Sequence, residues 1–349
     1  MEKKHSEVSN QNEDNIIKKL KKAIKDNTEL LNPKMQDTDN VFVSESNIRD
    51  NQEINLFFDN IGNIPILDIN VGNLLNIDKS NLLVSIINHM DDVSLETIYF
   101  YISIFKMITG DLPANISLIL SIVENHSNKS LFISRYNQNP DIINNFYGLA
   151  IISETIKMNM NIIDLTRLKE LLLDELKVIN HNKILSNYYL FNCINLLKKF
   201  NFNIEMNNDI LLRKINETQI NDTEKEEFIS NLFIILSISK LIDKNYSAKN
   251  IDNKSLKKFE DIIKNLYKND FSLTQYSKIL LIIDLLGFQQ KYSKEIKIWL
   301  NKLINHTKFF MSEIENEEFS WKNDITAFSI EVKMLYWILI TCLQYQSFF

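Results

Sequence analysis

Residues 142–179 read IINNFYGLAIISETIKMNMNIIDLTRLKELLLDELKVI, and two kinds of helix follow one another within them. The first segment, Ile142 to Ile156, is apolar nearly all round, as is typical of a helix that is buried on every side. In the second, Asp164 to Ile179, leucines recur every three or four residues among charged residues, which indicates a helix with one face in water. The two segments therefore predict a hairpin whose amphipathic helix covers its buried one.

The same alternation continues along the chain. Helices of the buried kind are predicted at Thr97 to Thr109, Ile142 to Ile156, Tyr188 to Lys198, Phe228 to Ile242, Thr274 to Gly287 and Phe328 to Leu343. Amphipathic helices are predicted at Ser80 to Met90, Ile116 to Glu124, Asp164 to Ile179, Asn208 to Ile215, Ser255 to Tyr267 and Ser293 to His306. Asp164, Ser255 and Ser293 suit the N-cap positions of their helices. The buried segments recur about every 42 to 54 residues, and such a period with one helix pair per unit is typical of a repeat protein.

The last repeat is apolar where an open array needs a polar end. Phe328 to Leu343 is among the most apolar segments, and Tyr345, Phe348 and Phe349 follow it. Terminal repeats of an open helical array carry a polar outer face. We therefore expect the array to close on itself as an all-α, (α/α)6 toroid of six helical hairpins over residues 51–349. An open array of the HEAT or TPR kind is the alternative.

Composition narrows the class of protein further. Of the 349 residues, 45% are hydrophobic, and only 5 are Gly and 4 are Pro, which favours helices over turn-rich β and α/β folds. A net charge of −6 argues against non-specific nucleic-acid binding. Residues 1–50 are mostly polar and offer too little apolar surface to offset ordering entropy, so we expect a mobile, largely disordered segment there.

The compartment can also be inferred from the sequence. The longest apolar run, Met334 to Leu343, is shorter than the roughly 18 residues that a membrane span needs. The polar opening residues lack the apolar region of a signal peptide. Cys193 and Cys342 are the two cysteines, and each lies in an apolar helical stretch. We expect a soluble, cytoplasmic protein without a membrane span, in which both thiols are buried and reduced.

Short stretches at the starts of the buried segments resemble one known family. Asn139-Pro140-Asp141, followed by Asn145-Phe146-Tyr147-Gly148, resembles the repeat of the prenyltransferase and squalene cyclase α/α-toroid superfamily. In that repeat a loop ending near Pro-Asp leads into a buried helix that opens with two aromatic residues. Asn187-Tyr188-Tyr189 and Thr97-Ile98-Tyr99 are similar, and the resemblance covers roughly residues 80–345. It implies a toroid with an apolar central cavity for an isoprenoid.

The sequence departs from the catalytic motifs of that family. Its protein prenyltransferases hold zinc through Asp, Cys and His, with the Asp and Cys two residues apart, and neither Cys193 nor Cys342 has an Asp at that distance. Its cyclases use Asp-x-Asp-Asp, and the nearest string, Met90-Asp91-Asp92-Val93, lacks the first Asp. The resemblance therefore implies a degenerate member. We expect no metal and no other cofactor, and we lean toward a protein that is not an enzyme.

Two other arrangements give weaker signals. Glu317, Glu318 and Asp324 lie with Trp321 in one predicted loop, and a glycoside hydrolase built on a six-hairpin ring would need such paired carboxylates. Ordinary solvated carboxylates explain them more simply, and we favour that interpretation. The five histidines are scattered and none has a metal-ligand spacing, so they predict no metal site.

Aromatic residues of the buried segments are the candidates for a ligand cavity. They are Tyr99, Tyr147, Tyr188, Tyr189, Tyr276, Tyr336 and Trp337. In a toroid some of them would line a central cavity suited to an isoprenoid or lipid-like small molecule, whereas ordinary core packing explains each one as well. Two hypotheses result: a toroid that binds such a ligand, or a non-catalytic helical-repeat scaffold that binds a protein partner. An open cavity favours the first, and a centre filled by side chains favours the second.

Overall fold

A computed structural model describes the chain from residue 93 to residue 348 with short gaps. The described residues are 93–113, 116–128, 130–134, 137–155, 163–177, 179, 184–216, 220, 223–266, 271–315 and 325–348. All of them belong to one unit, Ile54–Phe349. The predicted helix at Ser80 to Met90, the polar segment 1–50, the Asp91-Asp92 string and the carboxylates near Trp321 lie outside the described residues.

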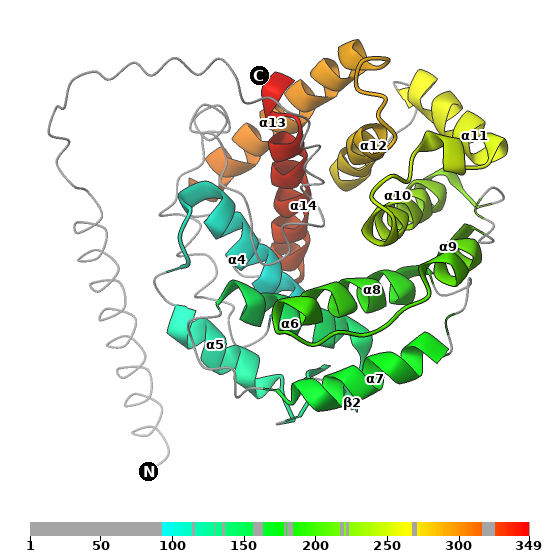
Figure 1. Ribbon diagram of the computed structural model, residues 1–349. Coiled ribbons are helices and arrows are strands. Elements are labelled where there is room, and N and C mark those ends of the chain that lie inside the picture. Colours follow the sequence, from blue (N-terminus) through cyan, green and yellow to red (C-terminus); the bar gives the residue numbers. More distant parts are fainter. Residues whose placement is uncertain are drawn as a thin grey trace, which may run out of the picture. The chain divides into compact units, whose positions relative to one another are not determined.

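The described part of the chain is all-α apart from one short hairpin, as predicted (Figure 1). The helices formed by the predicted buried segments are α4 (Leu95–Thr109), α6 (Ile142–Glu154), α8 (Ile184–Lys199), α10 (Lys225–Ile242), α12 (Leu273–Leu285) and α14 (Ile325–Gln344). The amphipathic ones are α5 (Ile116–Asn125), α7 (Leu165–Lys177), α9 (Asn208–Asn216), α11 (Asn253–Lys264) and α13 (Ser293–Glu315). Short 3-10 turns, η1 (Ala248–Asn250) and η4 (Gln346–Phe348), complete the helical elements. No described helix is both long and apolar enough to cross a membrane.

The six helices of the buried kind contact one another in a cycle. Along the chain α4 packs on α6, α6 on α8, α8 on α10, α10 on α12 and α12 on α14. The last of them then packs on the first, because α14 also contacts α4. An ion pair between Lys333 of α14 and Glu96 of α4, with Nζ and Oε1 2.8 Å apart, joins residues that are 237 positions apart in the sequence. The apolar last repeat is thus covered by the first described one.

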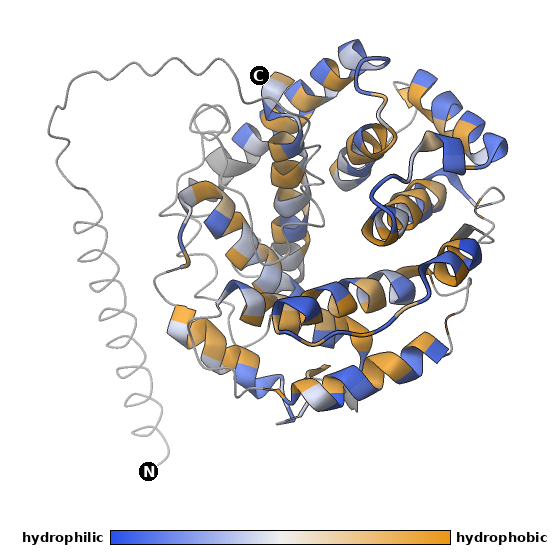
Figure 2. Ribbon diagram, viewed as in Figure 1, coloured by the Kyte–Doolittle hydropathy of each residue, from blue (hydrophilic) through white to orange (hydrophobic). Residues whose placement is uncertain are grey.

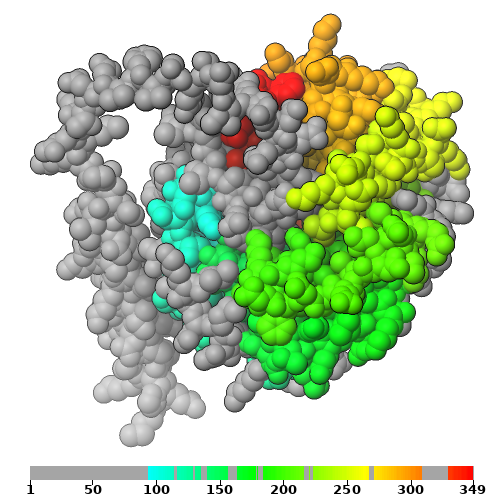
Figure 3. Space-filling model, viewed as in Figure 1, coloured from blue at the N-terminus to red at the C-terminus, as the bar shows by residue number. Residues whose placement is uncertain are grey.

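The amphipathic helices lie around the buried ones, and apolar and polar residues alternate along α7 and α11 (Figures 1 and 2). On α7 the buried residues are Leu168 and Leu172, and on α11 they include Phe259, Ile262 and Ile263. Residues of α11 and α13 form part of the molecular surface in Figure 3. Each of these two amphipathic helices therefore packs on the inner helices through one apolar face and leaves its polar face toward solvent.

Of the three predicted N-caps, one is confirmed and two are wrong. The Asp164 carboxylate accepts hydrogen bonds from the backbone N–H groups of Thr166 and Arg167 at the start of α7. At α11 the cap is Asp252, whose carboxylate accepts from the N–H of Ser255, so Ser255 lies inside the first turn. Ser293 is the first residue of α13 rather than its cap. Carboxylates and hydroxyls suit the cap position about equally, so residue type alone does not choose between neighbours.

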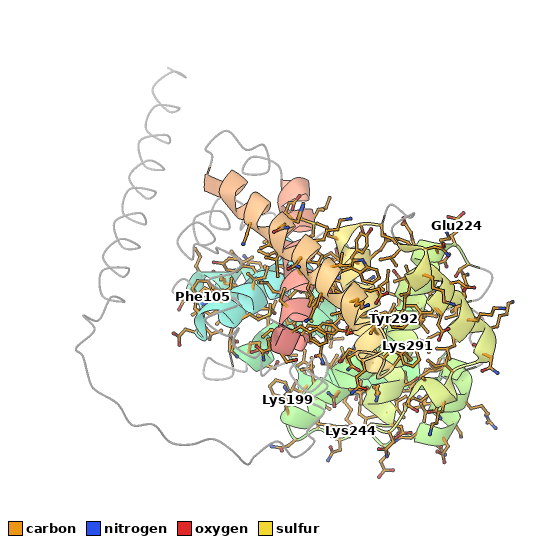
Figure 4. All side chains as sticks on the ribbon, turned by 90° about the horizontal axis from the view of Figure 1, so that it is seen from above. Phe105, Lys199, Glu224, Lys244, Lys291 and Tyr292 are labelled. Atoms are coloured by element: carbon orange, nitrogen blue, oxygen red, sulfur yellow. The ribbon has the colours of Figure 1, made fainter. Side chains whose placement is uncertain are left out.

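Two of the connections between helices contain residues that set their local conformation. Between α12 and α13, Lys291 forms an ion pair with Glu260 of α11, with Nζ and Oε1 2.5 Å apart. Lys291 also lies over the ring of Tyr292 at 5.1 Å, and Figure 4 shows these two residues together in that connection. After α4 the chain turns at Gly110, whose φ of 79° is a left-handed conformation that glycine adopts without strain.

Both cysteines are buried and free. Cys193 lies on α8 and Cys342 on α14, and neither is joined in a disulfide. Burial raises the pKa of the Cys193 thiol far above its usual range and that of Cys342 to about 12. A thiol in that state is protonated at neutral pH and is a poor nucleophile or metal ligand.

One buried side chain joins the β-hairpin region to α6. The hairpin pairs β1 (Ile133–Ser134) with β2 (Asn137–Pro140), and Phe132 immediately precedes it. The Asn145 amide of α6 accepts from the backbone N–H of Phe132 and donates to its carbonyl, each at 3.0 Å. Asn145 also donates to the carbonyl of Asp141 at 2.8 Å and is fully buried. The Asn145 side chain thus satisfies both backbone polar groups of Phe132, as a neighbouring strand would.

Replacing Asn145 with alanine is expected to lower the free energy of unfolding by on the order of 3 kcal/mol. The substitution removes the partner of two buried backbone groups, and each such loss costs about 1–3 kcal/mol. Asn144→Ala is the matched control, because its amide bonds to Asp141 in a part-buried setting. Urea denaturation followed by circular dichroism measures both. Equal losses for the two variants would contradict the role given to Asn145.

Candidate functional site

A cavity of about 360 Å³ opens among the six helices that form the cycle of contacts. Its lining residues are Glu96, Tyr99 and Phe100 of α4, Phe146 and Tyr147 of α6, Leu185, Tyr188 and Tyr189 of α8, Ser230, Asn231, Phe233 and Ile234 of α10, Lys278 of α12, and Lys333, Tyr336 and Trp337 of α14. Every one of the six helices therefore contributes to the wall. The residues come from the N-terminal or middle parts of their helices.

Aromatic rings in contact form much of this wall. The rings of Phe100 and Tyr336 have centroids 4.5 Å apart, which joins α4 to α14. Those of Phe146 and Tyr189 lie 5.3 Å apart and join α6 to α8. Contacts of this kind at centroid separations of about 4.5–7 Å are favourable and fix ring orientation. The wall is consequently held in shape by the ring contacts between neighbouring helices.

The second feature of the wall is a chain of polar contacts. Lys333 donates to Glu96, and the Tyr147 hydroxyl donates to the same Glu96 oxygen at 2.9 Å. The hydroxyls of Tyr147 and Tyr189 lie 3.0 Å apart. The contacts run in order through α14, α4, α6 and α8. They satisfy hydroxyl groups that would otherwise be desolvated without a partner.

The tyrosine hydroxyls of the wall are neutral at physiological pH. Burial raises the pKa of Tyr99, Tyr147 and Tyr188 well above the usual value, and neighbouring Tyr or Glu groups add to the effect. Burial also raises the pKa of Tyr189 to about 12. These groups can donate and accept hydrogen bonds, but they are not available as phenolate bases.

Lys278 is the polar residue that α12 contributes to the cavity. Its ammonium group donates to the Ser230 hydroxyl at 3.1 Å and lies 5.7 Å from the centre of the Trp337 ring. Burial lowers the pKa of Lys278 to about 8, and repulsion from Lys333 acts in the same direction. Among the described residues no carboxylate forms an ion pair with Lys278, whereas Lys333 has Glu96.

Six of the seven predicted aromatic candidates line this one cavity. They are Tyr99, Tyr147, Tyr188, Tyr189, Tyr336 and Trp337. Tyr276 is not among the lining residues, and its ring packs on Phe271 and on Trp299 of α13 instead, with centroids 6.1 Å away in each case. Tyr276 lies two residues before Lys278, which on a helix turns its side chain away from the side that Lys278 presents to the cavity.

The polar residues of the cavity were not predicted from the sequence. Glu96, Lys278 and Lys333 each lie at the start of, or within, a segment that is otherwise strongly apolar. A charged residue in such a segment is a signal, because an uncompensated buried charge is costly and is rarely kept without a partner or a role. The sequence pattern alone does not indicate that these three charged residues lie in the same cavity.

The described wall of the cavity holds few charged groups. Glu96 is the one carboxylate among the described lining residues, so a pair of acids for general acid–base catalysis is not assembled there. Within the described ranges no cluster of three His, Cys, Asp or Glu residues suits a metal ion. Comparison of the chain with family models, with curated proteins and with solved structures found no match.

Proposed function

We propose that this protein is an (α/α)6 toroid whose central cavity binds an isoprenoid or lipid-like small molecule without transforming it. The observation that carries the proposal is the aromatic-lined cavity of about 360 Å³ to which six helices contribute. On this proposal the chain is a degenerate relative of prenyltransferases and squalene cyclases, which has kept an apolar cavity and lost the acids and the zinc ligands.

The cycle of helix contacts supports the toroid. Within the described residues the apolar helix α14 packs on α4, as expected for a ring, whereas an open array would leave the last helix without such a partner. Five amphipathic helices within the described ranges lie around the cycle. The sixth predicted hairpin partner, Ser80 to Met90, falls outside those ranges.

The size and lining of the cavity support an apolar ligand of modest length. Small-molecule sites commonly have volumes of about 300–1,000 Å³ and are mostly apolar with a few polar groups. A cavity of 360 Å³ is near the lower end of that range and holds roughly a dozen water-sized groups at about 30 Å³ each. Geraniol and dodecanol are therefore suitable neutral probes.

Filling the cavity from its edge is expected to weaken binding of both neutral probes at least about tenfold. Leu185 lines the cavity and is 50% exposed, so Leu185→Trp can occupy cavity space at little cost to the core. Each methylene that the ligand can no longer bury costs about 0.8 kcal/mol, so two lost methylenes exceed a factor of ten. Isothermal titration calorimetry on the full chain measures the change.

Leu173→Trp provides the matched control for this experiment. Leu173 is an exposed leucine of α7 that is absent from the cavity wall, and it is 37% exposed. Its replacement should leave probe binding unchanged. If geraniol and dodecanol fail to bind the unaltered protein, the ligand-binding proposal is wrong and the scaffold hypothesis takes its place. Native mass spectrometry of protein purified from its own host gives an independent test through a retained ligand.

A further inference from the structure

We infer that the ligand of this cavity carries a single carboxylate on an apolar chain, and that Lys278 binds that carboxylate. The inference rests on the proposed function, because it names the chemical class of the ligand at the same site. It is carried by the position of the Lys278 ammonium group, which lies among aromatic side chains with a hydroxyl and a ring as its neighbours.

An ammonium group in this setting is poorly compensated. Its donor contact is to the neutral Ser230 hydroxyl, and the Trp337 ring offers a weak attraction at 5.7 Å. Transfer of a charged group from water into apolar surroundings is unfavourable unless an opposite charge accompanies it. The other wall lysine, Lys333, has such a partner in Glu96. An anionic ligand would give Lys278 a negatively charged partner, as Glu96 does for Lys333.

The charges of the wall suit a ligand with one negative charge. Lys278 and Lys333 contribute two positive charges and Glu96 contributes one negative charge, so the described lining has a net charge of +1. A carboxylate balances that charge. A phosphate or diphosphate brings more negative charge than the wall can neutralise, and surplus charge in a low-dielectric site is costly.

The surroundings of Lys278 also predict how binding depends on pH. The helices packed on α12 present Lys333 and Tyr336 from α14, the uncharged Ser230 and Asn231 from α10, and Lys302 of α13 over the ring of Tyr276 on another side. Across the cavity α4 contributes Glu96. Because the pKa of Lys278 is about 8 in the free protein, a carboxylate ligand should bind most tightly below that pH. Its affinity should fall as the pH rises toward 9.5, because the amine must then take up a proton to form the ion pair.

Comparison of dodecanoate with dodecanol tests the inference. The two probes share a chain and differ in the head group, so their affinity ratio isolates the carboxylate. Hydrogen bonds to charged groups are worth roughly a 10- to 100-fold change in affinity, and we expect dodecanoate to bind the unaltered protein more tightly by that factor at pH 7. Calorimetry on the full chain, below the micelle concentration of dodecanoate and the solubility limit of dodecanol, gives the two constants.

Two variants test whether the preference for dodecanoate depends on Lys278. Lys278→Met should abolish the preference for dodecanoate while dodecanol still binds, because methionine keeps most of the length of the side chain without its charge. Lys302→Met is the matched control and should keep the preference, since Lys302 lies outside the cavity wall over the ring of Tyr276 at 4.3 Å. The preference of the unaltered protein should also shrink between pH 7 and pH 9.5.

Each outcome decides between stated alternatives. Equal binding of the two probes to the unaltered protein, or a preference that survives Lys278→Met, overturns the carboxylate inference and leaves the apolar-ligand proposal intact. Tighter binding of dodecyl phosphate than of dodecanoate overturns the assignment of a single negative charge. Absence of binding by dodecanol and dodecanoate alike overturns this inference together with the proposed function.

Discussion

Gly148→Leu is expected to destabilise the protein by at least about 4–5 kcal/mol, a loss that single substitutions rarely reach. Gly148 lies in α6 and is buried against the ring of Phe132. A Cβ atom at this position would meet Cγ, Cδ2 and Cε2 of that ring well inside van der Waals distance. Since domains are stable by about 5–15 kcal/mol, this loss would remove from about a third to nearly all of the free energy of unfolding.

The Phe132 ring has little freedom to move away. Its Cγ atom is next to its own Cβ, so relief requires a different side-chain rotamer or a shift of the backbone. That backbone is held through both of its polar groups by Asn145. Phe132 is itself fully buried, so there is no solvent-facing direction for the ring to take. The smaller Gly148→Ala change should therefore still cost about 1–3 kcal/mol, as overpacking usually does.

The explanation predicts that the effect of Gly148→Ala on stability changes sign when the Phe132 ring is removed. In a helix interior, alanine is normally favoured over glycine by about 1 kcal/mol. In a Phe132→Ala background the ring is gone, and Gly148→Ala should then stabilise the protein relative to Phe132→Ala alone. Urea denaturation of the four proteins of this cycle gives the coupling free energy. If alanine at 148 is stabilising in the unaltered background, the close packing of Gly148 on Phe132 is not the constraint.

Lys106→Met is expected to lower the free energy of unfolding by about 3–5 kcal/mol. Lys106 in the last turn of α4 forms an ion pair with Glu154 at the end of α6. The Glu154 side chain is fully inaccessible to solvent, and that of Lys106 is 21% exposed. Removal of the ammonium group deprives a buried carboxylate of its cation, and the lost attraction is not replaced by water.

The double variant Lys106→Met/Glu154→Leu should recover most of that loss. Replacement of a buried ion pair by apolar residues of similar size is often neutral or stabilising, because the cost of desolvating both charges disappears. Lys177→Met serves as the control, since its ion pair with Asp174 is exposed on both sides and such pairs contribute about 0–1 kcal/mol. Thermal and urea unfolding of the four proteins measure the effect. A loss of similar size for Lys106→Met and Lys177→Met would refute the distinction.

The two kinds of helix could be predicted because their patterns are physical requirements. The leucines of α7 recur at helical spacing since one face meets the core, and segments such as Ile142 to Ile156 are apolar all round since neighbours surround them. The apolar segment that became α14 predicted a covering surface, and α4 provides part of it. These features depend on local sequence and on the burial that it demands.

The direction in which each buried helix faces could not be predicted. A helix that is apolar on every side has no preferred face in its sequence, so the rotation of α12 about its axis is set by the side chains packed around it. For that reason Tyr276 was assigned to the cavity and Lys278 was missed, although they are two residues apart. The adjacent residues Tyr188 and Tyr189 both line the cavity, because two neighbouring rings cover a wide arc of α8.

The contact between α14 and α4 has a consequence for biosynthesis. A ribosome makes α4 before the other five members of the cycle and α14 after them, so one flank of α4 stays uncovered while more than two hundred further residues are translated. An open array can consolidate from its first repeat as it emerges, but this fold reaches its final burial only when α14 has left the exit tunnel. We therefore expect the nascent chain to be prone to aggregation through that flank of α4 until α14 is available to cover it.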